Sequence, residues 1–253
     1  MNKTLIGVVT ANVKDYCWYD FKRQLKWLES KGMDIYIVDN SRTLVNRGFK
    51  GEWIKPSRTP QETTLECMNA LRDYFLKGDY DNLFILESDV FINDEALERL
   101  FKMQEMNGDV CNLTYPMRLK RFNKYSLCVQ STLGGVSKMI TPEDSQVLIN
   151  NGVQQLGKDN LCGRLLTHTG YGCTLVKRKV IEKIKFRATK SGDKMPFPDS
   201  FFHSDVLLAG FVNLLDTDYI CEHRNLKLET QTAINEMRYS KLSRRERRIL
   251  KGK

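Results

Sequence analysis

The 253-residue sequence lacks any apolar run near the ~18 residues that a membrane-spanning helix needs. Its first apolar stretch, residues 5–10, is too short for the apolar part of a signal peptide, and no small-residue cleavage site follows it. Internal repeats and low-complexity segments are also absent. We therefore expect a globular protein with no integral membrane segment, located in the cytoplasm.

The seven cysteines form no CxxC motif, and they are scattered along the chain. An odd number of scattered cysteines argues against a disulfide framework and against a zinc ribbon. It favours a reducing compartment in which most cysteines act as small, buried apolar residues.

Net positive charge is small over most of the chain and concentrated at its end. Residues 237–253 hold eight Lys or Arg and one acid, so they carry +7 of the net charge of +9 and leave +2 for the rest. We therefore divide the chain into a domain of residues 1–236 and a basic C-terminal extension of residues 237–253. A polyanionic partner is plausible for this extension.

The first half alternates short apolar runs with segments of helical periodicity. The expected strands are residues 5–10, 33–38, 52–54, 83–86 and 109–115, and the expected helices are residues 16–29, 59–76 and 94–106. This alternation predicts an α/β fold, with a mostly parallel, Rossmann-like sheet and helices on both faces. Ligands of such sheets bind outside the carboxyl ends of the strands.

The second half is less regular. Residues 116–140 are expected to form a long loop, and between residues 115 and 125 basic side chains are interleaved with aromatic ones. Beyond this loop the expected helices are residues 142–150, 179–184 and 199–211, and the expected strands are residues 172–176 and 218–221.

Two carboxylates, Glu87 and Asp89, follow the expected strand at residues 83–86 with only Ser88 between them. At the two-residue period of a strand, their side chains lie on the same side. Two oxygen ligands at the carboxyl end of a strand suit Mg²⁺ or Mn²⁺, with phosphate oxygens of a ligand completing the shell. The alternative is a pair of solvated acids at the start of a loop.

Three further polar residues lie at the ends of expected elements. Asp39 follows the strand at residues 33–38, Asp205 lies near the start of a helix, and His223 follows the strand at residues 218–221. Taken alone, Asp205 is typical of a helix N-terminus stabilised by the helix dipole. A histidine at a strand end can ligate a metal, but a lone one is more often a hydrogen-bonded polar residue.

Together and in this order, these motifs resemble the GT-A glycosyltransferases, especially glycosyltransferase family 2, over residues 4–225. Residues 87–89 resemble the DxD motif of that family, with Glu in place of the first Asp. Residues 203–205 resemble its acidic motif at the head of a helix, with His203 where the family has an acid. The 18-residue gap from Asp205 to His223 is similar to the family's gap to its metal-binding histidine.

Two donor-side segments extend this resemblance. Residues 37–41 resemble the segment that meets the nucleoside, and Asn69 lies where a less specific segment of the family is found. The resemblance implies a GT-A-like fold and the transfer of a sugar from a nucleoside diphosphate, with a UDP-sugar favoured, to an acceptor hydroxyl. It implies Mn²⁺ or Mg²⁺ held by Asp89, His223 and Glu87, donor contacts from Asp39, Asn69, Glu87 and Ser88, and Asp205 as general base.

The acceptor is predicted from charge. The basic extension and the loop at residues 115–125 favour DNA, through phosphate contacts and base stacking, with sugar transfer to a hydroxymethylated base taken out of the stack. Phage enzymes that modify DNA are the analogy, and they work in the host cytoplasm. The alternatives are a glycan or lipid-linked acceptor at a membrane surface, and a non-catalytic nucleic-acid-binding module. A nucleotidyltransferase is disfavoured because residues 10–14 contain no glycine.

Overall fold

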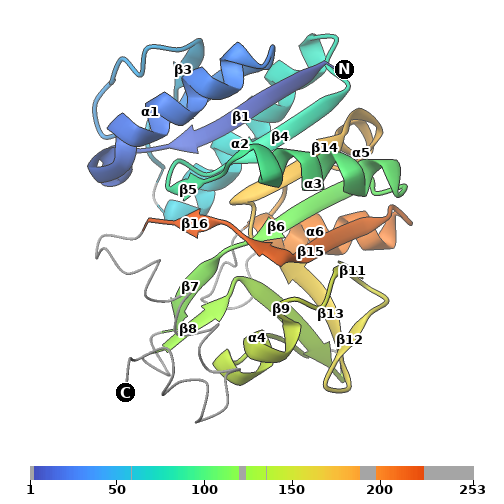
Figure 1. Ribbon diagram of the computed structural model, residues 1–253. Coiled ribbons are helices and arrows are strands. Elements are labelled where there is room, and N and C mark those ends of the chain that lie inside the picture. The colour runs from blue at the N-terminus through green and yellow to red at the C-terminus, as the bar shows by residue number, and fades with distance from the viewer. Residues whose placement is uncertain (1–2, 58, 120–123, 135, 189–197, 225–253) are drawn as a thin grey trace.

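The structure is a computed structural model that describes residues 3–57, 59–119, 124–134, 136–188 and 198–224. An eight-stranded sheet runs through its upper part in Figure 1. Its strands are β1 (Thr4–Thr10), β2 (Asp34–Asp39), β3 (Gly51–Trp53), β4 (Asn82–Leu86), β6 (Val110–Thr114), β11 (Val153–Gln155), β14 (Cys173–Lys177) and β15 (Asn213–Ile220).

The strand order in this large sheet is β11-β15-β6-β14-β4-β1-β2-β3. Strands β3, β2, β1 and β4 pair in parallel, as do β6 and β15. Strand β14 is antiparallel to both of its neighbours, β4 and β6, and β11 is antiparallel to β15 at the edge. The reversed β14 therefore begins where β4 ends, so the turn before it lies beside the carboxyl end of β4.

Helices cover both faces of this sheet. They are the short 3-10 helix η1 (Asn12–Lys14), α1 (Asp15–Ser30), α2 (Pro60–Lys77), α3 (Asp94–Glu105), α5 (Arg178–Lys183) and α6 (Pro198–Leu208), while α4 (Pro142–Leu148) packs on a smaller sheet. Local chemistry sets several of the ends. Thr59 caps α2 in a reciprocal capping box with Glu62, and Asn93 caps α3. Gly210 follows α6 with a positive φ of 79°, which favours glycine.

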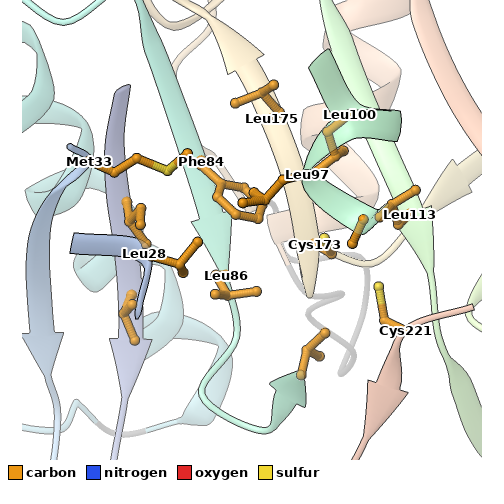
Figure 2. Close-up of a cluster of buried hydrophobic side chains, with 14 of the residues drawn as sticks. Leu28, Met33, Phe84, Leu86, Leu97, Leu100, Leu113, Cys173, Leu175 and Cys221 are labelled. Atoms are coloured by element: carbon orange, nitrogen blue, oxygen red, sulfur yellow. The ribbon is translucent and has the colours of Figure 1, made fainter. Parts of the chain in front are cut away.

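Alternate side chains of each strand enter two separate cores. Ile6 and Phe84 join the core that α1 and α3 cover, of which Figure 2 shows the central part. Their neighbours Leu5 and Leu83 join the opposite core, which α2, α5 and α6 cover. Because strands in this position bury both faces, they read in the sequence as continuous apolar runs.

A smaller four-stranded sheet lies below the large one in Figure 1. This small sheet consists of β9 (Val129–Leu133), β10 (Val136–Met139), β12 (Asn160–Leu161) and β13 (Arg164–Thr169). Two short pairs accompany it: β7 (Pro116–Leu119) with β8 (Lys124–Leu127), and β5 (Val90–Phe91) with β16 (Glu222–His223). A third core, built on Leu127, Val129 and Leu148, joins the small sheet and α4.

The α/β prediction is confirmed, and the first-half elements lie within one or two residues of the expected bounds. The prediction of a loop over residues 116–140 was wrong, because strands β7 to β10 occupy most of it. These strands are short and mix polar with apolar residues, so they lack a continuous apolar run. Strand β15 also begins five residues earlier than expected, because its buried Asp216 and Thr217 interrupt the apolar pattern.

Residues 120–123, in the basic and aromatic segment, and the basic extension at residues 237–253 lie outside the described residues. Among the residues that are described, no helix is both long and apolar enough to cross a membrane.

Candidate functional site

His223 and Asp89 meet at the carboxyl end of β4. The antiparallel pair of β5 with β16 sets His223 opposite Val90, and the amide of Arg224 donates to the carbonyl of Asp89 at 2.8 Å. The Nε2 atom of His223 lies 3.2 Å from Oδ2 of Asp89. Its Nδ1 donates to the carbonyl of Pro116 at 2.9 Å, which fixes the orientation of the ring.

Asp89 is almost fully buried and contacts two nitrogen-bearing side chains, those of Lys14 and His223. The ammonium of Lys14 forms an ion pair with Oδ2, the same oxygen that faces His223. Burial acts to raise the pKa of Asp89, but the hydrogen bond from His223 and the charge of Lys14 outweigh it and lower that pKa. Burial likewise acts to lower the pKa of His223, but its hydrogen bond with Asp89 and the charge of Asp89 raise it. The carboxylate of Asp89, with its lowered pKa, is therefore ionised at neutral pH.

Glu87 lines a cleft of about 460 Å³ beside the ends of β1 and β4. Its lining also includes Thr10, Lys14 and Tyr171. Burial raises the pKa of Glu87 to about 7, with a further increase from the nearby charge of Asp89. Two neighbouring carboxyl groups thus ionise in different pH ranges, a property typical of functional sites.

Tyr115 supports the imidazole of His223 from the large sheet. The two rings have centroids 5.0 Å apart, and the Tyr115 side chain lies against two glycines in the turn between β13 and β14. A Cβ on Gly172 would lie 2.2 Å from Cε1 of Tyr115, and a Cβ on Gly170 would lie 2.1 Å from its hydroxyl oxygen. Glycine is required at both positions because of this close approach.

Asp205, expected to be the general base, is held in an ion pair on α6. Both of its carboxylate oxygens accept hydrogen bonds of 2.7 Å from Arg187. His203, in the acidic position of the family motif, is fully buried, and its Nδ1 lies 3.0 Å from the side-chain nitrogen of Asn213. Neither residue has a hydrogen bond to Glu87, Asp89 or His223 among the described residues.

Asp199 approaches the site from the first turn of the same helix. Its charge contributes to the raised pKa of Glu87, after burial and after Asp89, and also to that of Tyr171. Burial raises the pKa of Asp199 itself. Asp199 therefore lies within electrostatic range of the cleft, at the end of α6 where the helix dipole stabilises a carboxylate.

The expected donor-binding residues are more dispersed. Asp39 is buried; its Oδ1 accepts a 2.7 Å bond from the amide of Ser41, and its Oδ2 is paired with Arg47. Asp39 and Arg47 line a second cleft of about 450 Å³ next to Trp53.

Two other expected donor contacts are bonded within the protein. The hydroxyl of Ser88, which lines the first cleft, accepts a 2.9 Å bond from that of Thr10. The side-chain nitrogen of Asn69 on α2 donates to the carbonyl of Phe186 at 3.2 Å, and its buried Oδ1 has no hydrogen-bond partner among the described residues. The structure thus places Asp89 in contact with His223 and within electrostatic range of Glu87, whereas Asn69 does not line the cleft.

Lys14 and Asp199 were not among the residues selected from the sequence, and Tyr115 was selected as part of the expected DNA-contacting segment at residues 115–125, whereas the structure buries it beside His223. Asp199 had a usable signal, because it follows Pro198 at the start of an expected helix. Lys14 and Tyr115 had none, since their positions depend on pairing between distant strands. No group of three or more His, Cys, Asp or Glu side chains arranged to hold a metal ion is found among the described residues.

No protein-family model and no curated protein sequence matches the chain. Among solved structures, the chain is similar to S. aureus TarS 1-349 in complex with UDP, with a TM-score of 0.51 and 11% identity over 93% of this chain and 64% of that one. It is also similar to TarS 1-349 in complex with UDP-GlcNAc (TM-score 0.49, 12% identity, 91% and 61%) and to A197 from STIV (0.47, 16%, 88% and 86%).

The chain thus spans less than two thirds of the TarS segment. A likeness at this level of identity concerns the fold, and the fold of this chain is GT-A-like.

Proposed function

We propose that this protein is a glycosyltransferase that transfers a sugar from a nucleoside-diphosphate sugar to an acceptor hydroxyl. The observation that carries the proposal is the contact of Asp89 with His223 at the carboxyl end of β4, within electrostatic range of Glu87, which lines the cleft. Open α/β sheets bind their ligands at that edge. The UDP complex of TarS, which has a similar fold, supports a uridine nucleotide as the donor.

The residues at this edge fit a divalent cation such as Mn²⁺ or Mg²⁺. Oδ1 of Asp89 is buried and has no hydrogen-bond partner among the described residues, and the Nδ1 bond to Pro116 directs Nε2 of His223 toward that carboxylate. With two protein ligands, the shell would be completed by oxygens of the diphosphate. The bound cation would supply positive charge for the leaving diphosphate.

We assign the general base to Asp199 in place of Asp205. The bidentate pair with Arg187 engages both oxygens of Asp205. The charges of Asp199 and Asp205 both act on Tyr171, but of the two it is Asp199 that contributes to the raised pKa of Glu87. Burial raises the pKa of Asp199 toward the working pH, which suits a group that must accept the proton of an acceptor hydroxyl. A base opposite the leaving group predicts inversion at the anomeric carbon.

For the acceptor we propose a hydroxymethylated base in DNA, in the manner of a phage DNA-modifying enzyme. The support is the +7 charge of residues 237–253 and the basic and aromatic composition of residues 115–125. A glycan or lipid-linked acceptor is the alternative. Acceptor assays run in parallel with hydroxymethylated DNA, with glycans and with lipid-linked glycans distinguish the two.

The donor site is tested by thermal unfolding of the full chain with UDP, GDP, CDP or ADP, each with EDTA or with Mn²⁺. A ligand that binds the native state raises the melting temperature. We expect an increase with UDP and Mn²⁺ together that exceeds the separate effects of UDP and of Mn²⁺. The Asp89→Asn variant is the matched comparison and should lose this joint effect. If no nucleotide raises the melting temperature, the proposed activity is wrong and a non-catalytic nucleic-acid-binding module becomes the better interpretation.

A further inference from the structure

Lys14 places a positive charge directly on the carboxylate that the proposed metal would use. It is the last residue of η1, immediately after β1, and its ammonium pairs with Oδ2 of Asp89. The Asp89 side chain is 2% exposed, whereas that of Lys14 remains 32% exposed. A buried carboxylate without a counter-charge is strongly disfavoured. Lys14 therefore stabilises Asp89 from the solvent side of the site.

The ammonium and a divalent cation cannot occupy this carboxylate independently. Lys14 and His223 both contact Oδ2, and Oδ1 has no partner among the described residues. A cation bound to Asp89 would lie close to the ammonium, and like charges at such short distances repel strongly in a partly buried site. Binding of the metal must therefore work against Lys14 or displace it.

The side chain of Lys14 is partly exposed and lines the cleft with Glu87. Its ion pair with Asp89 is the polar contact that the described residues give its ammonium. Departure of the ammonium breaks this ion pair, whose positive charge the metal would replace, and leaves the backbone bond from the amide of Lys14 to the carbonyl of Ala11 in place.

We propose that Lys14 is a displaceable cation of the donor site, which neutralises Asp89 until a divalent cation replaces it and then contacts the diphosphate. This inference rests on the proposed function, because it requires a metal on Asp89 and a diphosphate in the cleft. In this proposal Lys14 first pairs with Asp89 and then, after the metal has bound, with the diphosphate. Binding of the metal and binding of the nucleotide therefore favour each other.

The first experiment measures Mn²⁺ binding to the full chain without nucleotide, from the electron paramagnetic resonance signal of free Mn²⁺. Lys14→Gln removes the competing charge and should bind Mn²⁺ about tenfold more tightly than wild type, which corresponds to ~1.4 kcal/mol. Lys14→Arg keeps the charge and should bind with an affinity close to that of wild type. An unchanged or weaker affinity in Lys14→Gln overturns the inference.

Lys31→Gln is the matched control. Lys31 also pairs with an aspartate, Asp94, and its side chain is 34% exposed, close to the value for Lys14. This variant should bind Mn²⁺ like wild type. If Lys31→Gln and Lys14→Gln gained Mn²⁺ affinity equally, the gain would result from the lower net charge of the protein, and the inference would be overturned.

Asp89→Asn separates this inference from the proposed function. If Asp89→Asn loses Mn²⁺ binding while Lys14→Gln binds like wild type, the metal site stands and the role of Lys14 is wrong. If Asp89→Asn binds Mn²⁺ like wild type, the metal is not on Asp89, and both the proposed metal site and the inference fail.

A second experiment needs no variant and applies even if Lys14→Gln does not fold. Wild-type protein is treated briefly with an acetylating ester in EDTA or in Mn²⁺, and the modification of each lysine is measured by mass spectrometry. Release from Asp89 should increase the acetylation of Lys14 several-fold in Mn²⁺, and addition of UDP should reverse the increase. Acetylation of Lys31 should stay constant. Equal acetylation of Lys14 in EDTA and Mn²⁺ overturns the inference.

Discussion

Asp89 and His223 are 134 positions apart in the sequence, and Nε2 of the histidine lies 3.2 Å from Oδ2 of the aspartate. The two-stranded pairing of β5 with β16 creates this contact, and the carbonyl of Pro116 orients the imidazole. Three separate segments of the chain thus define one small polar site. Because the site depends on these few contacts, single substitutions should have distinct and measurable effects.

Asp89→Asn should abolish metal-dependent transfer with the fold intact. The substitution keeps the shape of the side chain but removes the charge that a divalent cation needs, so we expect a loss of about 10²–10³-fold in turnover, as for other electrostatic groups of active sites. Donor turnover and far-ultraviolet circular dichroism check the two parts of the prediction. The control is Asp94→Asn, at an exposed carboxylate in the first turn of α3. Turnover equal to that of wild type in Asp89→Asn would contradict the proposal that Asp89 is a metal ligand.

Asp199→Asn and Asp205→Asn should differ in their effects. Loss of the general base typically lowers the rate ~10²–10⁴-fold, and we expect this for Asp199→Asn. Asp205→Asn removes an ion pair with the partly exposed Arg187, so its free energy of unfolding should fall by only about 0–1 kcal/mol while activity remains. Transfer rates of both variants, measured with the same acceptor, decide the assignment. The opposite pattern would return the role to Asp205.

Gly172→Ala should destabilise the protein and disturb His223. The added Cβ would overlap the ring of Tyr115, which packs against the imidazole. Overpacking of this kind typically costs about 1–3 kcal/mol in the free energy of unfolding, measurable by urea denaturation. Tyr115→Leu removes the overlapping ring, so the double variant should recover part of the loss relative to the sum of the single variants. Strict additivity would mean that the two residues do not interact.

His203 should make the protein less stable in acid. Burial lowers its pKa to about 3, whereas an unfolded chain has a histidine pKa near 6.5. The unfolded state therefore binds an extra proton between these values, so the stability from neutral His203 is complete above pH 6.5 and is lost as pH falls toward 3. The slope is ~1.4 kcal/mol per pH unit for one proton. Urea denaturation at pH 7, 5.5 and 4.5 should give a shallower decline for His203→Gln than for wild type.

Deletion of residues 237–253 should affect the acceptor and spare the donor. The segment carries +7, so its removal should weaken binding to DNA and reduce the dependence of that binding on salt. The joint stabilisation by UDP and Mn²⁺ should persist, because the donor residues lie in the described core. Fluorescence anisotropy with labelled DNA over a salt series measures the first effect. Unchanged affinity and salt slope would favour a glycan or lipid-linked acceptor.

The sequence predicted the first half of the fold closely because the central strands bury both faces. Strands such as β1 and β4 are nearly continuous apolar runs. The helices between them have recognisable caps, such as Thr59 at the start of α2. The small sheet was missed because its strands alternate polar side chains with few apolar ones. In β9 the buried residues are Val129 and Ser131, and only one of the two gives an apolar signal.

The candidate site was only partly visible in the sequence. The order of the motifs predicted that Asp89 and His223 belong to one site, and the structure places them in contact, although their roles remain predictions. The motif at residues 203–205 locates helix α6, but it does not show which carboxylate of that helix is paired with a basic side chain. Arg187 lies 18 residues from Asp205, and Lys14 lies 75 residues from Asp89, so neither pairing follows from local spacing.

The turn between β13 and β14 joins the small sheet to the cleft through three residues, Gly170, Tyr171 and Gly172. The amide of Glu87 donates to the carbonyl of Gly172 at 3.1 Å, and Tyr171 lines the same cleft. A molecule that binds the small sheet and shifts β13 therefore also moves a group bonded to Glu87. Thermodynamic reciprocity then requires occupancy of the cleft to alter affinity at the small sheet by an equal factor. The strength of such a coupling, whichever ligand binds first, would thus be a property of this short turn.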